Sequence, residues 1–226
     1  MSFPGGTSVT RLTVYPDGGG TPHVHLASTE AYVVIGGRGE LHTLDVSGEH
    51  RTPLAEGSTV WFRPGTIHRA VNHGELRVVV VMSNAGLPEA GDAVMTFPPE
   101  VLADPERYRE AVALPAPQRR DLAVEGFRRL TGDPRLLDEF YDQAVALVRP
   151  AVAGWRELWH TTVEAETRRT AAVLTALSGG DGRHLRETAL YGSAQSDTDR
   201  PGMCGRLRTH DVLRPEVIRG SGEPAR

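Results

Sequence analysis

The chain has 226 residues, of which 39% are hydrophobic and 24% charged, and its formal net charge is -4 at pH 7. This length and composition suit a globular protein with a sizeable core. The weak negative charge gives no electrostatic basis for binding nucleic acid or an anionic membrane. No stretch approaches the roughly 20 apolar residues of a membrane-spanning helix. We therefore expect neither nucleic acid nor a membrane as a partner.

The sequence contains no lysine and a single cysteine, Cys204. Without lysine, Schiff-base catalysis and a P-loop are excluded, and one cysteine excludes both an internal disulfide and a thiolate metal site. Any metal site must therefore consist of histidines and carboxylates. Cys204 has no evident base beside it and is interpreted as an ordinary tail residue rather than a nucleophile. The first residues resemble no secretory signal, so a cytoplasmic location is expected.

The first part of the chain, about 85 residues, has the pattern of short antiparallel strands. Runs of β-branched and aromatic residues alternate with Gly, Pro and Asp. The strands are expected near residues 9–15, 23–25, 31–35, 40–45, 59–63, 69–72 and 77–82. The glycines at 36–39 and the segment 72–74 are interpreted as tight reversals between strands. Because no helical pattern interrupts these strands, a barrel or sandwich is predicted.

From about Pro98 onward the apolar residues follow a helical period. Two stripes, at 136–148 and 152–177, predict helices whose apolar faces make core contacts. Asp133 and Pro134 are expected to start the first of them, and weaker patterns predict helices at 98–113 and 117–130. Trp155 and Trp159, on the second stripe, could pack on the barrel or form a dimer interface. Residues 181–226 are predicted to be an irregular, partly mobile tail in which only 212–218 docks.

Two histidines two positions apart, His23 and His25, fall on a predicted strand. Residues at this spacing point to the same side of a strand, so both rings are expected to face one barrel interior. Glu30 follows five positions later, where the chain enters the next strand. A second cluster surrounds a turn and the start of another strand, and it consists of Gly57, Pro64, Gly65, His68 and Asn72.

These residues resemble the two sequence motifs of the cupin family. His23, His25, Glu30 and Gly37 match the first motif, in which His-x-His is followed by a spaced Glu and Gly. The second cluster matches the other motif, although Pro64 stands one place late and abuts Gly65. Asp17 stands where the family has a glycine before the first histidine, with Gly18 beside it. These departures affect turns and leave the ligand positions intact, and the resemblance covers residues 8–83.

The resemblance implies a mainly β fold: a single cupin barrel (a double-stranded β-helix or jelly roll) at 1–97. A helical extension would follow at 98–180, and the tail at 181–226. It implies that His23, His25, Glu30 and His68 hold one divalent metal ion, which could be Fe, Mn, Ni, Zn or Cu. The alternative is that these side chains fill the barrel without a metal. Cupins commonly dimerise, so a homodimer is also expected.

Four further side chains are candidates for the cavity wall: Tyr32, Trp61, Arg63 and Arg77. Tyr32 shares its strand face with Glu30 if alternation holds, and an inward arginine could pair with a carboxylate on a ligand. His42, His50 and His73 fit no ligand position and are interpreted as surface or turn residues.

The resemblance leaves two classes of function open. The first is an enzyme acting on a small organic molecule, with dioxygenase-type oxidation as the leading reaction and metal-assisted isomerisation or lyase chemistry next. Glu30 could then also act as a base. The second is a non-enzymatic module that binds or senses a small ligand. A fold alone does not choose between these classes.

Overall fold

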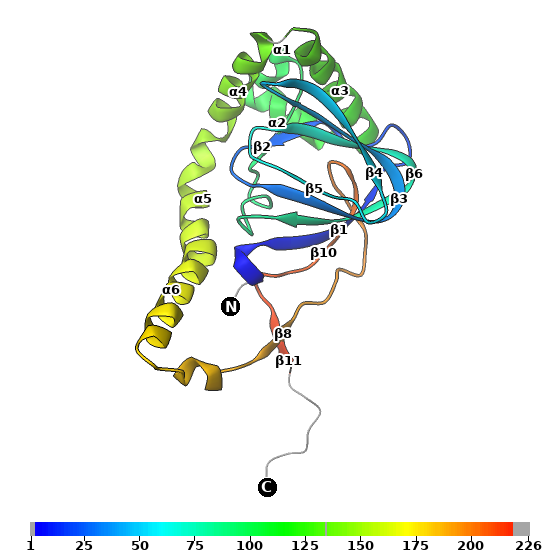
Figure 1. Ribbon diagram of the computed structural model, residues 1–226. Coiled ribbons are helices and arrows are strands. Elements are labelled where there is room, and N and C mark those ends of the chain that lie inside the picture. The colour runs from blue at the N-terminus through cyan, green and yellow to red at the C-terminus, as the bar shows by residue number, and fades with distance from the viewer. Residues whose placement is uncertain (1–2, 134, 219–226) are drawn as a thin grey trace.

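The computed structural model describes residues 3–133 and 135–218. A curved antiparallel sheet forms a barrel, helices α1–α4 pack over one end of it, and α5 and α6 run down one side (Figure 1). The strands are β1 (Ser8–Val14), β2 (His23–His25), β3 (Glu30–Asp45), β4 (Gly48–Ala55), β5 (Thr59–Phe62), β6 (Ile67–Met82), β7 (Ala93–Met95), β8 (Leu190–Gly192), β9 (Arg200–Pro201), β10 (Gly205–Thr209) and β11 (Glu216–Ile218). The α-helices are α1 (Pro99–Leu102), α2 (Pro105–Ala113), α3 (Ala116–Gly132), α4 (Arg135–Val148), α5 (Val152–Trp159) and α6 (Ala165–Ser178). Short 3-10 turns lie at Pro4–Gly6, Arg149–Ala151 and Arg183–Arg186, and the π-helical segment His160–Glu164 joins α5 to α6.

Nine of the described strands form one sheet with the order β4-β3-β6-β1-β10-β9, in which β5 pairs with β3 and β2 pairs with β6 and β7. The predicted barrel and the helices after it are confirmed. Inside the barrel, apolar side chains from β1, β3 and β6 form one core, which includes Leu12, Tyr32, Val34, Val78 and Val80. These positions alternate along their strands, as expected for a sheet with one buried face.

Two expected reversals are absent, because the glycines bend long strands instead of ending them. The segments 31–35 and 40–45 belong to the single strand β3, and 69–72 and 77–82 both belong to β6. The register between β3 and β6 shifts at Gly36, Arg38 and Gly39, which marks irregular pairing of the bulge kind. Gly37 has φ +73°, and a Cβ there would lie 2.2 Å from the carbonyl oxygen of Glu75. Gly37 is therefore needed where β3 and β6 approach each other closely, and both strands continue past this point.

Strands β4 and β7 were not predicted from the sequence. In β4 only Leu54 is buried, so the polar run of this outer strand lacks the alternation by which strands are recognised. β7 has three residues, of which Val94 and Met95 are buried, and pairs with β2. A segment of this length has too few residues to show the alternation of buried and exposed positions that identifies a strand.

The helical layer has a core of its own that reaches the barrel. Phe97, Phe127 and Phe140 pack there with Val24 of β2 and Ile67 of β6. The Thr96 hydroxyl donates to the carbonyl oxygen of Ala123 in α3, at 2.8 Å. The helices therefore cover the outer side of the two strands that carry the predicted histidine ligands.

The first predicted apolar stripe is confirmed in α4, where Leu137, Phe140 and Ala144 are buried. The backbone N–H of Arg135 donates to the Asp133 carboxylate at 3.1 Å, as expected for a helix start. Pro134, the other residue of that prediction, lies outside the described residues.

The second apolar stripe is only partly a core contact. Trp155 is buried and its indole N–H donates to the carbonyl oxygen of Ala90 at 3.1 Å, so this tryptophan packs on the barrel's loops. α6 has no buried residue, and Leu174 and Leu177 are exposed. The prediction that the whole stripe is core is therefore wrong beyond α5.

The segment predicted to be an irregular tail contains short strands at 190–192, 200–201, 205–209 and 216–218, and its residues 219–226 lie outside the described residues. β10 pairs along its length with β1 and so extends the barrel sheet. Nearby, the Thr21 N–H donates to the Met203 carbonyl oxygen at 2.9 Å. The segment predicted to dock, 212–218, is buried at its start, at Val212, and its end forms β11, which pairs with β8 in a separate two-stranded sheet. Among the described helices, none is long and apolar enough to span a membrane.

We predict that Phe140→Ala lowers the free energy of unfolding by about 3–5 kcal/mol, because it removes a ring from the centre of the helical core. Urea denaturation of the full chain measures this. The control is Glu139→Ala, on the exposed side of the same helix, which should change stability by less than about 0.5 kcal/mol. Equal stability losses in the two variants would show that α4 is not anchored through Phe140.

Candidate metal centre

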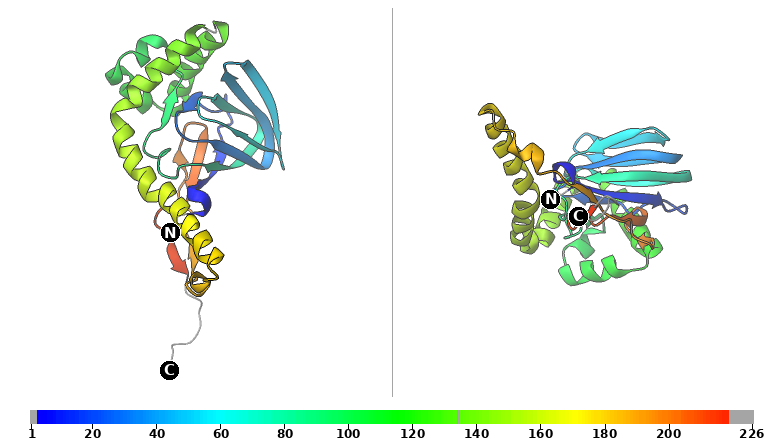
Figure 2. Two further views of the ribbon diagram at one scale, coloured as in Figure 1. Left: turned by 60° about the vertical axis from the view of Figure 1, so that its left-hand side comes forward. Right: turned by 90° about the horizontal axis from the view of Figure 1, so that it is seen from below.

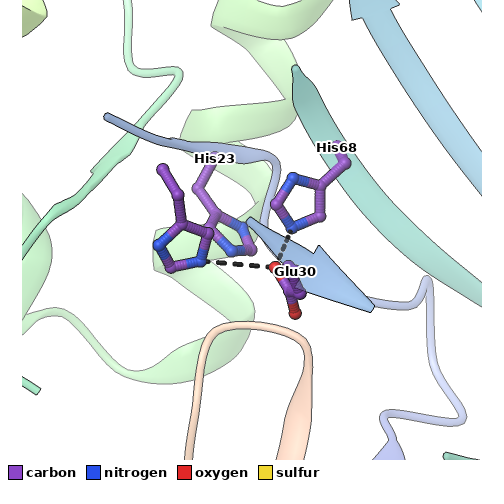
Figure 3. Close-up of side chains that lie close together, drawn as sticks. His23, Glu30 and His68 are labelled. Carbon is purple, nitrogen blue, oxygen red and sulfur yellow. Dashed lines mark ion pairs between the residues drawn. The ribbon is translucent and has the colours of Figure 1, made fainter. Parts of the chain in front are cut away.

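Four buried side chains converge in the barrel: His23, His25, Glu30 and His68. Each offers one ligand atom, and these atoms lie within 4.8 Å of one another. Glu30 Oε2 is 3.0 Å from His68 Nε2 and 3.3 Å from His25 Nε2. Figure 3 shows the histidine rings turned toward this carboxylate. The structure thus brings together the four residues that the sequence motifs single out.

Strand alternation places these residues. In β2, His23 and His25 point into the barrel while Val24 between them enters the helical core. In β6, Ile67 enters the same core and His68 faces His23, with which it pairs in register. Each of the three histidines therefore has an apolar neighbour in the helical core that fixes its strand from behind.

Each imidazole has its Nδ1 atom engaged on the side away from the centre. His23 Nδ1 is 2.8 Å from the Thr21 carbonyl oxygen, and His68 Nδ1 is 3.1 Å from that of Thr66. His25 Nδ1 is 2.7 Å from Oδ1 of the buried Asp92. Since a carbonyl oxygen can only accept, Nδ1 of His23 and His68 must carry the proton. In a neutral ring Nε2 then presents its lone pair to the centre.

Two atoms at the centre lack a hydrogen-bond partner among the described residues, namely Glu30 Oε2 and His68 Nε2. Buried polar atoms without partners are costly, and such atoms at a functional site indicate an ion or water that completes them. Three Nε2 atoms and a carboxylate oxygen are a donor set that divalent transition metals accept. The residues present therefore fit a metal ion.

The pKa shifts of the cluster residues also favour a cation at this position. Burial lowers the pKa of His23 well below 6.5, and the neighbouring rings of His68 and His25 lower it further. Burial opposes charge on Glu30 as well, but His68 and His25 hold its pKa well below 4.5. For His25 burial is the largest influence, but the nearby carboxylates of Asp92 and Glu30 outweigh it and raise its pKa to about 10. The cluster thus stabilises positive charge next to a buried carboxylate.

Three of the four cluster residues, His23, His25 and Glu30, line a cavity of about 230 Å³. Tyr32 also lines it and is fully buried, in agreement with its predicted place on the face of Glu30. Its hydroxyl lies 3.9 Å from the Cys204 sulfur, and burial raises the pKa of both side chains, that of Cys204 to about 11. Cys204 is therefore a protonated thiol at neutral pH and part of the barrel interior, which corrects the prediction of an ordinary tail residue.

The other three candidates for the cavity wall, Trp61, Arg63 and Arg77, are exposed. Trp61 is 70% exposed. It pairs with Ala31, whereas its neighbour Phe62 pairs with Glu30 and packs its ring 4.2 Å from that of His68. The alternation of side chains along β5 thus turns Trp61 outward, and Arg63, just after this strand, is exposed as well. Arg77 lies between buried Leu76 and Val78, so its side chain also faces away.

Sequence reasoning missed Asp92 and Phe62, which contact His25 and His68 directly. Asp92 lies 67 positions after His25 and belongs to neither motif, so no spacing indicates it. His42 and His73 flank Glu40, with His42 Nε2 3.0 Å from its Oε2, and neither joins the cluster.

The fold and site define a class: antiparallel β-barrel proteins in which histidines and a carboxylate face a small cavity. Residues 10–83 match the family model of the cupin domain, and this part of the chain is a cupin domain. The remaining helices and C-terminal strands lie outside the match. No curated protein matches the sequence.

Several solved structures are similar to part of this chain. The chain is similar to Pac13, a nucleoside dehydratase (17% identity, covering 34% of this chain and 58% of that one, TM-score 0.30). Pac13 from Streptomyces has also been solved with uridine. It is similar to QdtA, a sugar 3,4-ketoisomerase from Thermoanaerobacterium thermosaccharolyticum in complex with TDP (18%, 38% and 64%, TM-score 0.34). A Klebsiella pneumoniae protein with a double-stranded β-helix domain is 26% identical (34% and 64%, TM-score 0.29). The chain thus spans under two thirds of the length of each of these proteins.

We predict that Asp92→Asn weakens divalent-metal affinity about 10- to 100-fold while the protein stays folded. The carboxylate that orients the His25 ring and sustains its basicity would be lost. Competition titration with a chromogenic chelator measures the affinity, and Asp121→Asn, at an exposed position, is the matched control. Unchanged affinity in Asp92→Asn would mean that Asp92 does not support a ligand.

Proposed function

We propose that the protein is a metal-dependent cupin enzyme that acts on a small organic molecule. One divalent ion, of Fe, Mn, Ni, Zn or Cu, would be held by His23, His25, Glu30 and His68. The observation that carries the proposal is the convergence of three imidazoles, each engaged at Nδ1, on a buried carboxylate oxygen without a hydrogen bond. When bound, such an ion supplies Lewis acidity and coordination positions for exogenous ligands.

Among the possible reactions, oxidation by dioxygen is the leading proposal, and isomerisation or lyase chemistry is second. Outside the cluster, the titratable side chains that line the cavity among the described residues are Tyr32, Glu89 and Cys204. The raised pKa values of Tyr32 and Cys204 leave both protonated at neutral pH, so neither is a base. Proton abstraction would thus depend on Glu30 or on exposed Glu89. This scarcity of bases supports a reaction with little demand for protein acid–base groups.

The first test is metal content. Protein purified without a metal-affinity tag should carry about one divalent ion per chain, and His25→Ala should lose most of it because a ligand and its Asp92 support are removed together. His50→Ala is the control, since His50 lies on β4 away from the cluster and should retain full occupancy. Elemental analysis giving equal metal in both variants would contradict the ligand assignment.

The second test separates an enzyme from a sensing or structural module. Catalysis requires a coordination position open to exogenous ligands. We expect azide to shift the visible spectrum of the Co(II)-loaded protein, and the Fe(II)-loaded protein to consume dioxygen with a subset of small organic substrates. A fully loaded protein that responds to no small anion would favour the non-enzymatic alternative. Turnover without dioxygen consumption would favour isomerase or lyase chemistry.

We also propose a homodimer. α6 extends away from the barrel (Figure 2) and exposes Leu174 and Leu177, and the β8–β11 sheet exposes Leu190, Val217 and Ile218. Covering such apolar surface favours association. Sedimentation velocity should give a dimer for the native protein and a monomer for the double variant Leu174→Arg/Leu177→Arg. A monomeric native protein would contradict the proposal.

A further inference from the structure

Opposite the metal cluster, one wall of the cavity carries a row of hydroxyl groups. Ser8 and Thr10 on β1 and Thr209 on β10 all line the cavity. Thr10 and Thr209 are direct partners in the register of β1 and β10. None of the three hydroxyls bonds to another group within residues 3–133 and 135–218. These groups can therefore both donate to and accept from a bound molecule.

The sheet register relates this row to the cluster. Met82 on β6 pairs with Glu30 on one side and with Ser8 on the other, and Val80 likewise pairs with Tyr32 and with Thr10. Adjacent strands are about 4.8 Å apart, so Ser8 and Thr10 on β1 lie on the order of 10 Å from β3 across the sheet, and Thr209 on β10 lies one strand farther. A molecule bound beside Glu30 reaches the hydroxyls only if its polar groups are separated by a comparable length.

The space between them is small and lined mostly by apolar side chains, among them Leu12, Val80, Met82 and Leu207. Its volume of about 230 Å³ corresponds to roughly seven or eight water molecules, and drug-sized ligands occupy about 300 Å³ or more. This space suits a compound of about ten non-hydrogen atoms with an apolar middle.

The charge of the wall restricts the compound further. Among the described residues that line the cavity there is no arginine, and the sequence has no lysine. The charged groups outside the histidines are the carboxylates of Glu30 and Glu89. A phosphate or carboxylate away from the metal-binding end would find no cation here and would be desolvated without a partner.

We infer that the substrate is a small compound that binds the metal through one end and carries an uncharged hydroxyl or carbonyl group at the other. The hydroxyl row of Ser8, Thr10 and Thr209 recognises that far group. This inference rests on the proposed metal site, and it excludes nucleotides, sugar phosphates and dicarboxylates as substrates.

The test uses three hydroxamates with the same metal-binding head and different tails, each titrated into the full-length Co(II) protein by visible spectroscopy. We expect 6-hydroxyhexanohydroxamate to bind about fivefold more tightly than hexanohydroxamate, the gain of a hydrogen bond. The carboxylate-ended adipate monohydroxamate should bind at least tenfold more weakly than the hydroxyl-ended compound.

Thr10→Val and, separately, Thr209→Val should remove the advantage of the hydroxyl-ended tail while metal content stays unchanged. Thr13→Val is the matched control, because Thr13 is exposed on the other face of β1, and it should preserve the preference. Thermal melting checks the fold of each variant, and Ser8→Ala provides a third, smaller change at the row.

Failure of this inference is distinct from failure of the metal site. If the protein takes up no Co(II), the proposed function falls, and the inference falls with it. If Co(II) binds but the carboxylate-ended tail binds as well as the hydroxyl-ended one, the substrate class is wrong and the metal site stands. Metal-loaded protein that binds no hydroxamate, or a hydroxyl preference that survives all three substitutions, would also overturn the inference.

Discussion

The interaction on which the site depends is the burial of the Glu30 carboxylate among three imidazoles. A carboxylate removed from water is strongly destabilising unless positive charge and hydrogen bonds compensate it. Here the rings of His23 and His68 are held by backbone carbonyl oxygens and that of His25 by Asp92. The outer partners thus fix the ring orientations, and the inner atoms are left to be completed by a cation. A single divalent ion would supply the positive charge that the buried carboxylate requires, whereas a proton on His25 supplies only part of it.

The helical layer has a direct part in holding these groups. Val24 and Ile67, the neighbours of the cluster histidines, are buried in the core that α1–α4 contribute. The Tyr141 hydroxyl in α4 donates to the Gly65 carbonyl oxygen at 2.7 Å, close to the start of β6, and Trp155 in α5 donates to Ala90 just before Asp92. Figure 1 shows these helices packed against the end and side of the barrel. The helices therefore act as a support for β2, β6 and the Asp92 loop, and β2 in particular, with three residues, has little hydrogen bonding of its own.

Whether a feature could be predicted from the sequence depends on how far apart in the chain its interacting residues lie. The four cluster residues could be predicted because they lie in two short motifs that resemble those of the cupin family, and strand alternation gives the common direction of His23 and His25. Asp92 and Cys204 could not, since their places depend on contacts across 67 and 172 positions. The orientation of Trp61 and Arg63 required the register of β5 on β3, which no local pattern reveals. Gly37 was interpreted as a turn because positive φ suits a reversal and a strand crossing equally well.

The cavity joins two parts of the chain with different roles. Its metal end is built from β2, β3 and β6, which carry the family motifs, whereas its far wall combines β1 with β10 from the C-terminal segment. β10 lies outside residues 10–83, so the matched cupin segment alone does not contain the complete cavity. Met203, Cys204, Leu207 and Thr209 all reach the cavity from this late segment. The far wall can therefore change in β10 without altering the four cluster residues on β2, β3 and β6. Under the proposed function, β10 is then the part of the chain where the choice of substrate is most open to change.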